Sequence, residues 1–408
     1  MIKVLIIAPM APFVVEEVVR LSSVLEVHLE LPPDFRYSRY YDYLKDLLKK
    51  TSSSIYVSHA PYIDLRALLH ATSFLRFYPI HALMRDPLLI YSEIRRTNNC
   101  LNIIRFHDVD IIHSHFAYQE GFIGYLIKNL LERKKFVVTL HGNDILIEPS
   151  IGYGIRLDKR YDIVVRKVLE KADAIIVASK AVYEEAKKLV NDYKKLYLVP
   201  NGVDLQKFNP SIDGSMIRKL YDTEDKYIVF TLRHHEPQYG IVYLILAASI
   251  VLRHRKDVIF IIGGDGSLRN YHINLAKRLG IENYVFFPGR IPRTDVPMYY
   301  AASDIVVVPS LQEAWGLVAT EAMACGKPVI ASSVGGLLDQ IIDDFNGFLV
   351  PPRNPKAIAD KILYLLENPS EMKRMGLNSR RLAEEKFDIE RRVDKIVKLY
   401  KELIEKVR

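Results

Sequence analysis

Short apolar segments alternate with helical segments along the whole 408-residue chain, and this alternation limits what the chain can fold into. Short apolar runs predict buried strands, and the segments between them predict helices that connect one strand to the next. This order is typical of α/β folds with parallel sheets. The predicted strands cover 2–8, 25–31, 55–58, 111–114, 136–140, 174–178, 196–199, 227–232, 258–262, 284–287, 305–308, 329–331 and 347–350.

The alternation is interrupted once, near the middle of the chain. Pro200-Asn-Gly202 and Asn209-Pro210 are turn signals, and the strand pattern restarts after them. A chain of this length is expected to form two domains. The segment from Arg381 to Arg408 predicts one long, charged amphipathic helix. The predicted units are a first Rossmann-like domain over 1–205, a second over 206–385 and a terminal helix over 386–408.

Composition excludes several classes of protein. The net charge of +8 is shared by both halves of the chain, so a nucleic-acid partner is not predicted. No run of about 18 uncharged apolar residues is present, and a membrane-spanning helix is not expected. Cys100 and Cys325 are the only cysteines, which argues against a disulfide framework and favours a cytoplasmic protein.

The segment 65–105 combines arginines with apolar and aromatic residues, and it lacks acidic residues as far as Arg85. Such a segment is a candidate for peripheral contact with the inner face of an anionic membrane. The aromatic and basic stretch Phe35–Tyr41 adds to that interpretation. An apolar helix with snorkelling arginines, packed on the first domain, accounts for the same pattern.

Two carboxylates flank a Trp-Gly turn in the second half of the chain. Glu313 follows an apolar strand, Gly316 opens a short helix, and Glu321 lies within that helix. A helix N-terminus offers free N–H groups and the positive end of a dipole, which suits a phosphate. A diphosphate bound there would leave Glu321 near a ribose and Glu313 near the group that the diphosphate carries. This layout suits an activated sugar.

The segment Glu313–Glu321 resembles the E-x7-E motif of the large retaining glycosyltransferase family 4, whose members have the GT-B fold. Further segments resemble the family in the right order from about residue 109 to the C-terminus. They are Ala172–Ser179, Pro200–Asp204 with Phe208, Gly335-Gly336 and Asn346–Pro351. The resemblance implies two Rossmann-like domains facing a cleft, with the last helix crossing back to the N-terminal domain.

The resemblance also implies an activity: a retaining, metal-independent transfer of a sugar from a nucleoside-diphosphate donor to a hydroxyl of a glycan, lipid-linked or small-sugar acceptor. Glu313 would hold the donor sugar and Glu321 the ribose. Arg233, at the end of a strand, would bind the diphosphate, together with the backbone amides near Gly316 and Leu317. A cation is needed there because negative charge grows on the leaving group.

Two glycine loops are further candidates for donor binding. Gly264 and Gly266 follow the strand at 258–262, and the nicotinamide fingerprint is excluded because Arg269 stands where its third glycine belongs. The resemblance implies that this loop lies along the nucleotide. It also implies that the backbone at Gly289 and Arg290 reads the edge of the base. A plain turn is the alternative for each loop.

His141 and Asp144, in the segment Leu140–Asp144, follow a first-domain strand and resemble the H-G-x-D segment of the family. This implies that His141 lies at the donor sugar and acceptor, with Asp144 beside it as a second catalytic residue. A hydrogen-bonded structural histidine is the alternative. His113 and His115 have the spacing of a metal pair, but no third ligand is indicated, so lining of the acceptor site or a structural role is favoured.

The chain departs from the family pattern at two places. The lysine that normally helps to clamp the diphosphate is replaced by Tyr239, and His234, His235 or Lys327 are candidates to replace its charge. The first strand-to-helix turn, Ala8–Phe13, has no glycine.

Two alternatives to a glycosyltransferase stay open. One is a nucleotide-sugar epimerase, which needs no acceptor. The other is a non-catalytic homologue that binds a partner enzyme or a lipid. The missing lysine and the glycine-free loop motivate the second alternative, whereas retention of both glutamates argues against it.

Overall fold

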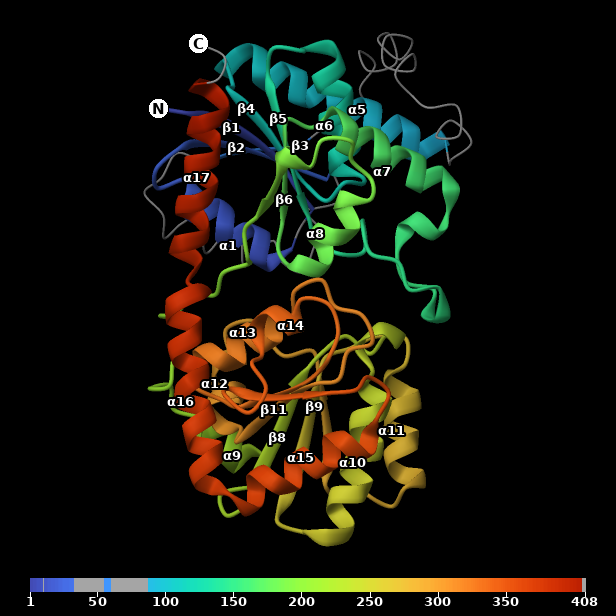
Figure 1. Cartoon of the computed structure of the whole chain (residues 1–408), viewed down its shortest axis with the longest axis vertical. Helices are drawn as coiled ribbons and strands as arrows, with labels where there is room; N and C mark the ends of the chain where they lie inside the picture. The colour runs from blue at the N-terminus through green and yellow to red at the C-terminus, as the bar shows by residue number, and fades with distance from the viewer. Residues whose placement is uncertain (10, 33–54, 60–86, 406–408) are drawn as a thin grey trace. The chain divides into compact units, whose positions relative to one another are not determined.

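The computed structural model describes residues 1–9, 11–32, 55–59 and 87–405, which form two compact units. Unit 1 contains residues 1–199 and 392–408, and unit 2 contains residues 200–391. Each unit is built on one parallel sheet, with seven described strands in unit 1 and six in unit 2 (Figure 1). The α/β class, with two doubly wound parallel sheets, is confirmed.

The strand order of unit 1 is β3-β2-β1-β4-β5-β6-β7, and that of unit 2 is β10-β9-β8-β11-β12-β13. All thirteen predicted strands are present, with ends within two residues of the predicted ones. They are β1 (Lys3–Ile7), β2 (Glu26–Leu31), β3 (Ile55–His59), β4 (Ile111–His115), β5 (Lys135–Leu140), β6 (Ala174–Val177), β7 (Leu196–Leu198), β8 (Tyr227–Leu232), β9 (Val258–Gly263), β10 (Val285–Gly289), β11 (Ile305–Val308), β12 (Val329–Ser332) and β13 (Gly347–Val350).

Helices cover both faces of the unit 1 sheet. On one face, α5 (Pro87–His107) packs on α6 (Glu120–Leu130), which packs on α7 (Lys159–Lys171). On the other face, the apolar side chains of β1 and β2 form a core with α1 (Pro12–Leu21) and α17 (Ile389–Glu405). The remaining described α-helix of this unit is α8 (Lys180–Lys187).

Unit 2 has the same three-layer arrangement. The helices α10, α11 and α15 share a buried core with the sheet. A second group of helices, α9, α12, α13 and α16, forms contacts within itself from one helix to the next (Figure 1). The helices are α9 (Ser215–Leu220), α10 (Ile241–His254), α11 (Arg269–Arg278), α12 (Val296–Ala302), α13 (Leu317–Ala324), α14 (Leu337–Gln340), α15 (Pro355–Glu367) and α16 (Pro369–Lys386).

The single terminal helix predicted from Arg381 onward is wrong, because the chain ends α16 at Lys386 and starts α17 at Ile389. Val203 accounts for the break. Its N–H donates to the carbonyl of Phe387 (2.7 Å), and its carbonyl accepts from the N–H of Ile389 (3.1 Å). Gly202 permits this approach, since a Cβ there would lie 2.3 Å from the Ile389 Cα. From Arg392 onward, α17 belongs to unit 1.

The segment proposed for membrane contact is only partly described. Residues 35–41 and 65–86 lie outside the described residues. In α5, Arg95 and Arg96 are 5% and 2% exposed, and Arg96 is paired with Glu30 and Glu120. These two arginines therefore do not face a membrane, which corrects the prediction for this part of 65–105. Among the described residues, no helix combines the length and apolar character that crossing a bilayer needs.

Candidate active site

The predicted donor-site residues of unit 2 lie at the carboxyl ends of parallel strands, where open α/β sheets bind ligands. Arg233 directly follows β8, and Glu313 lies on the loop after β11. Their side chains form an ion pair, and the Ser310 hydroxyl donates to the Glu313 carboxylate (3.1 Å). The structure therefore brings together the cation predicted to bind the diphosphate and the first of the two carboxylates, Glu313.

Two neighbouring loops, one with Gly335 and Gly336 and one with Gly264 and Gly266, approach the residues of this ion pair closely. A Cβ on Gly335 would lie 1.7 Å from the Glu313 carbonyl oxygen, and one on Gly264 would lie 1.9 Å from the Arg233 carbonyl oxygen. Gly336 donates its N–H to the Glu313 carbonyl (3.0 Å), which holds that loop in place. Gly266 packs in the same way on His235. These loops thus position Arg233 and Glu313.

Gly316 and Leu317 form the start of α13, as the sequence predicts. Gly316 precedes the helix with φ of 101°, a conformation that favours glycine, and Leu317 is its first residue. Side-chain hydrogen bonds hold this turn in place: the Thr320 hydroxyl accepts from the indole N–H of Trp315 (3.0 Å) and donates to the Gln340 side chain (2.9 Å). The helix N-terminus therefore has a defined direction.

Glu321 is more enclosed than the sequence suggests. Its side chain is 4% exposed, one carboxylate oxygen pairs with Arg293, and the other accepts from the Tyr300 hydroxyl (2.9 Å). Arg293 lies on the loop after β10, with its guanidinium 5.0 Å from the centre of the Phe208 ring. Each carboxylate oxygen has two lone pairs, so Glu321 retains the capacity to accept a ribose hydroxyl.

The replacement of the clamp lysine has a structural counterpart. The Tyr239 ring lies 4.5 Å from the Arg233 guanidinium, close enough for a cation–π interaction that holds the arginine without adding a charge. Two of the three proposed substitutes are engaged elsewhere: His235 shares a hydrogen bond with His272, and Lys327 donates to the carbonyl of Ala301. Of the three, only His234 is exposed.

Gly289 and Arg290 lie at the carboxyl end of β10. Gly289 has φ of 76°, and its carbonyl accepts from the Gly264 N–H (2.7 Å), so the two glycine loops are joined by their backbones. Arg290 is exposed. The backbone of Gly289 and Arg290 therefore lies next to the loop of Gly264 and Gly266, where the family resemblance implies that the nucleotide binds.

In unit 1, His141 follows β5 and stands among aromatic rings. The ring centres of Phe13 and Phe116 lie 5.1 and 4.4 Å from that of His141. Burial lowers the pKa of His141 well below its ordinary value, so the ring is neutral at neutral pH. His141 is therefore suited to exchange hydrogen bonds with a hydroxyl.

The structure gives Asp144 backbone partners. It is 1% exposed, and its carboxylate accepts the backbone N–H groups of His141 (3.1 Å), Gly142 (2.8 Å) and Ala117 (2.8 Å). Through these bonds Asp144 holds the His141 loop in place. The catalytic role predicted for Asp144 stays a prediction.

A buried chain of polar groups leads from α17 to His141. Arg392 donates to Glu17 Oε2 (2.5 Å), Glu17 Oε1 lies 3.8 Å from His115 Nε2, and His115 Nδ1 shares a hydrogen bond with His141 Nε2 (3.0 Å). His113 instead bonds Tyr400 and Thr139. His113 and His115 thus face different partners, which agrees with the predicted structural or site-lining role.

Unit 1 also contains a cavity of about 520 Å³ at the carboxyl ends of β1, β2 and β4. The glycine-free first turn contributes Pro9, and α5 contributes Arg96. Arg96 is bound by Glu30 (2.8 Å) and by Glu120 (3.1 Å), so two carboxylates face one guanidinium. The lining residues are Pro9, Pro32, Ser92, Arg96, Phe116, Tyr118, Gln119 and Glu120.

Sequence reasoning missed the partners of the predicted residues. Arg293, Gln340, Arg96 and Arg392 come from segments distant in the chain and carry no motif. Local patterns give no signal for these partners, because they depend on contacts between different elements of the fold.

Two parallel α/β units, with the candidate ligand residues at strand carboxyl ends, define the GT-B class, and comparisons with known proteins agree. Residues 215–382 match the family described as glycosyl transferases group 1, and residues 75–207 match glycosyltransferase family 4. An uncharacterised glycosyltransferase of Methanocaldococcus jannaschii is 33% identical over 74% of this chain and 78% of its own length.

Two further similar proteins are known with their sugar nucleotides. The Escherichia coli UDP-Gal:alpha-D-GlcNAc-diphosphoundecaprenol alpha-1,3-galactosyltransferase is 28% identical over 81% of this chain and 84% of its own length. The crystal structure of HepE from Anabaena in complex with UDP-glucose superposes with a TM-score of 0.77 at 21% identity, over 98% of this chain and 100% of that one. The chain belongs to glycosyltransferase family 4 and is a glycosyltransferase.

The buried histidines predict a loss of stability in mild acid. Burial lowers the pKa of His115 to about 3 and of His235 and His272 to about 4, from an ordinary value of 6.5. Below pH 6.5 the unfolded chain takes up protons that the folded chain does not, so stability should fall between pH 6.5 and 4. Each histidine contributes up to about 1.4 kcal/mol per pH unit.

Urea unfolding at pH 7.5 and 5.5 measures this loss. The variant His272→Asn should show a smaller difference between the two pH values than the wild type. The variant His254→Asn, which changes an exposed histidine at the end of α10, should not. Equal stability of the wild type at both pH values would contradict the prediction.

Proposed function

We propose that this protein is a retaining, metal-independent glycosyltransferase that moves a hexose from a nucleoside diphosphate, with a uridine nucleotide as the first donor to test, to a hydroxyl of a neutral sugar. The observation that carries the proposal is the Arg233–Glu313 ion pair at the sheet edge, next to the N-terminus of α13. The choice of uridine is supported by the UDP-galactose donor named for the E. coli relative and by the UDP-glucose in the HepE complex.

Binding of a diphosphate would change the partners of this ion pair. Arg233 has a cation–π contact with Tyr239 and donates to Ser310, so its guanidinium stays in place when a phosphate approaches. The phosphate competes with Glu313 for Arg233, and Glu313 becomes available for the hydroxyls of the sugar. The free enzyme thus keeps a buried carboxylate paired until the donor arrives.

The same groups stabilise the leaving group. As the glycosidic bond breaks, negative charge grows on the diphosphate, where Arg233 and the amides at Gly316 and Leu317 counter it without a metal ion. The leaving phosphate then accepts the proton of the attacking hydroxyl on the same face of the sugar. Bond formation and bond cleavage on one face retain the anomeric configuration.

The acceptor class follows from the cavity in unit 1. Among its described lining residues and their partners, Arg96 is paired with Glu30 and Glu120, and Arg95 also acts on Glu30 electrostatically, so the positive charge is already compensated. A phosphate or carboxylate there would have to compete with these carboxylates for Arg96, whereas the hydroxyls of a neutral sugar match the polar groups of Ser92 and Tyr118. The acceptor is therefore a neutral glycan, or the terminal sugar of a lipid-linked saccharide.

The donor site is tested with uridine and guanosine nucleotides in the presence of EDTA. A nucleotide at about 100 times its Kd should stabilise the wild type by about 2.7 kcal/mol. Glu321→Ala should abolish this stabilisation. Glu313→Gln should keep it and lower the transfer rate at least about 100-fold, because the sugar loses its carboxylate. The exposed control Glu282→Gln should leave both unchanged.

NMR of the anomeric proton then reports the stereochemistry of the product. Retention in EDTA supports the proposal, and inversion or a metal requirement contradicts it. No stabilisation by any nucleotide would favour a non-catalytic homologue. Conversion of the donor sugar without an acceptor would favour an epimerase.

The acceptor class is tested by comparing kcat/KM for neutral glycosides with that for the corresponding sugar phosphates. The neutral series should be preferred at least about tenfold, equivalent to about 1.4 kcal/mol. Glu120→Gln removes one of the two carboxylates that face Arg96 and should narrow this preference. A wild-type preference for sugar phosphates would overturn the assignment of a neutral acceptor without affecting the donor site.

The buried chain behind His141 makes a separate prediction. Glu17 Oε1 lies 3.8 Å from His115 Nε2, beyond hydrogen-bond distance, but its negative charge favours a proton on that nitrogen. His115 Nδ1 then accepts from His141 Nε2, and His141 Nδ1 is left as an acceptor. In Glu17→Gln, Arg392 continues to donate to the side-chain oxygen, so the amide NH2 group points toward His115 Nε2. An N–H group there favours an unprotonated His115 Nε2. The proton of His115 then moves to Nδ1, and that of His141 moves from Nε2 to Nδ1.

The transfer rate of Glu17→Gln should fall at least about tenfold while nucleotide binding in unit 2 is retained. Nitrogen-15 chemical shifts of the histidine rings distinguish this effect from a loss of fold, because they report the tautomer of His141 directly. Unchanged shifts together with an unchanged rate would show that Glu17 does not position His141.

A further inference from the structure

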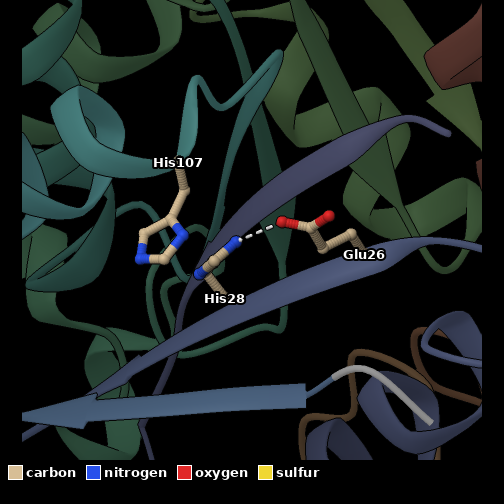
Figure 2. A group of neighbouring side chains, drawn as sticks. All are labelled: Glu26, His28 and His107. Atoms are coloured by element: carbon tan, nitrogen blue, oxygen red, sulfur yellow. Dashed lines mark hydrogen bonds and ion pairs between the residues drawn. The ribbon is translucent and has the colours of Figure 1, made fainter.

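A second group of polar side chains in unit 1 takes no part in the proposed transfer. Glu26 and His28 lie on the same face of β2, two residues apart, and His107 is the last residue of α5. One ligand atom from each residue lies within 4.8 Å of the others. Figure 2 shows the His28 ring between the other two side chains, with its Nε2 directed at Glu26 (3.0 Å).

We propose that Glu26, His28 and His107 form a binding site for a late first-row divalent cation, with Zn²⁺ as the expected ion. Two imidazoles and one carboxylate are a ligand set that such ions accept, and water completes the coordination. The site is independent of the donor and acceptor residues, and it does not depend on the proposed function.

The distances between the three potential ligand atoms are close to those of a zinc site. Zinc–ligand bonds of about 2.0–2.2 Å place neighbouring ligand atoms about 3.4 Å apart. The Glu26–His28 pair, at 3.0 Å, already meets this spacing, and the ion would replace the proton that joins them. His107 has to move its ring by about an ångström, and its position at the end of a helix permits that movement.

The surroundings prepare His28 as a ligand. Its ring is 2% exposed and contacts the rings of Tyr56, at 4.8 Å, and His107, at 4.2 Å, so its orientation is restricted. Its Nε2 atom is directed at Glu26 Oε1 (3.0 Å), so the two potential ligand atoms on β2 already lie next to each other.

One residue opposes the cation. The Lys3 ammonium lies 3.6 Å from Glu26 Oε1 and competes for the same carboxylate. Its side chain is 35% exposed, so it can turn to solvent when the ion binds. The ion would then join β2 to the end of α5, two elements far apart in the sequence, and would stabilise unit 1 by binding only to the folded chain.

The test uses the full-length chain without a histidine tag, stripped with a chelator. Zn²⁺ is titrated in competition with a chromophoric chelator, and Co²⁺ absorption reports the ligand set. The wild type should bind one Zn²⁺ ion. In His107→Ala and in Glu26→Gln the affinity for this ion should be reduced at least about tenfold. His254→Ala, which removes the corresponding last histidine of α10, should bind as the wild type does.

Lys3→Gln distinguishes ligation from general damage to the fold. Removing the ammonium should tighten Zn²⁺ binding and increase the rise in melting temperature that Zn²⁺ produces, whereas a damaged fold would weaken both. Three outcomes overturn the proposal: no saturable binding by the wild type, binding unchanged in both His107→Ala and Glu26→Gln, or weaker binding in Lys3→Gln. Because the readout is metal binding and not transfer, failure here leaves the proposed activity unaffected.

Discussion

The parallel ladder is the constraint on which the rest of this structure depends. In each unit every described strand pairs in parallel with its neighbours, so all strands end at one edge of the sheet. Residues that directly follow a strand are therefore brought together, however far apart they are in the chain. Arg233 and Glu313 meet after β8 and β11, and His115 and His141 meet after β4 and β5. The candidate active site is a consequence of strand direction.

Electrostatic pairing then defines what each edge can bind. In unit 2, Arg233 and Glu313 neutralise each other, and the proposed diphosphate would have to compete with Glu313 for the arginine. In unit 1, Arg96 is shared by Glu30 and Glu120, which leaves the cavity without surplus positive charge. Buried charges are costly unless they are paired, so each of these pairs limits which ligand can enter. The two units differ in this respect although their architectures are alike.

Glycine and backbone contacts supply the precision that the charges need. At Gly335 and Gly264 a side chain would collide with the carbonyl of Glu313 or Arg233, so the loops that carry these residues can meet only through glycine. Asp144 acts in the same way in unit 1, because its carboxylate collects three backbone N–H groups and thereby holds His141. The proposed zinc site has no comparable backbone support, which agrees with the movement that His107 would need.

The sequence by itself determined the fold class, the positions of the strands along the chain and the residues at strand ends. These follow from local hydrophobic patterns and from glycine and proline signals, which act over a few residues. Only the tertiary structure decided the partners: Arg293 for Glu321, Arg392 for Glu17, and the division of the terminal helix at Phe387, where Val203 inserts its hydrogen bonds. These contacts join residues 28 to 375 positions apart, and they leave no periodic trace in the chain. They depend on packing, and so the roles of Asp144 and Arg96 became visible only in the folded protein.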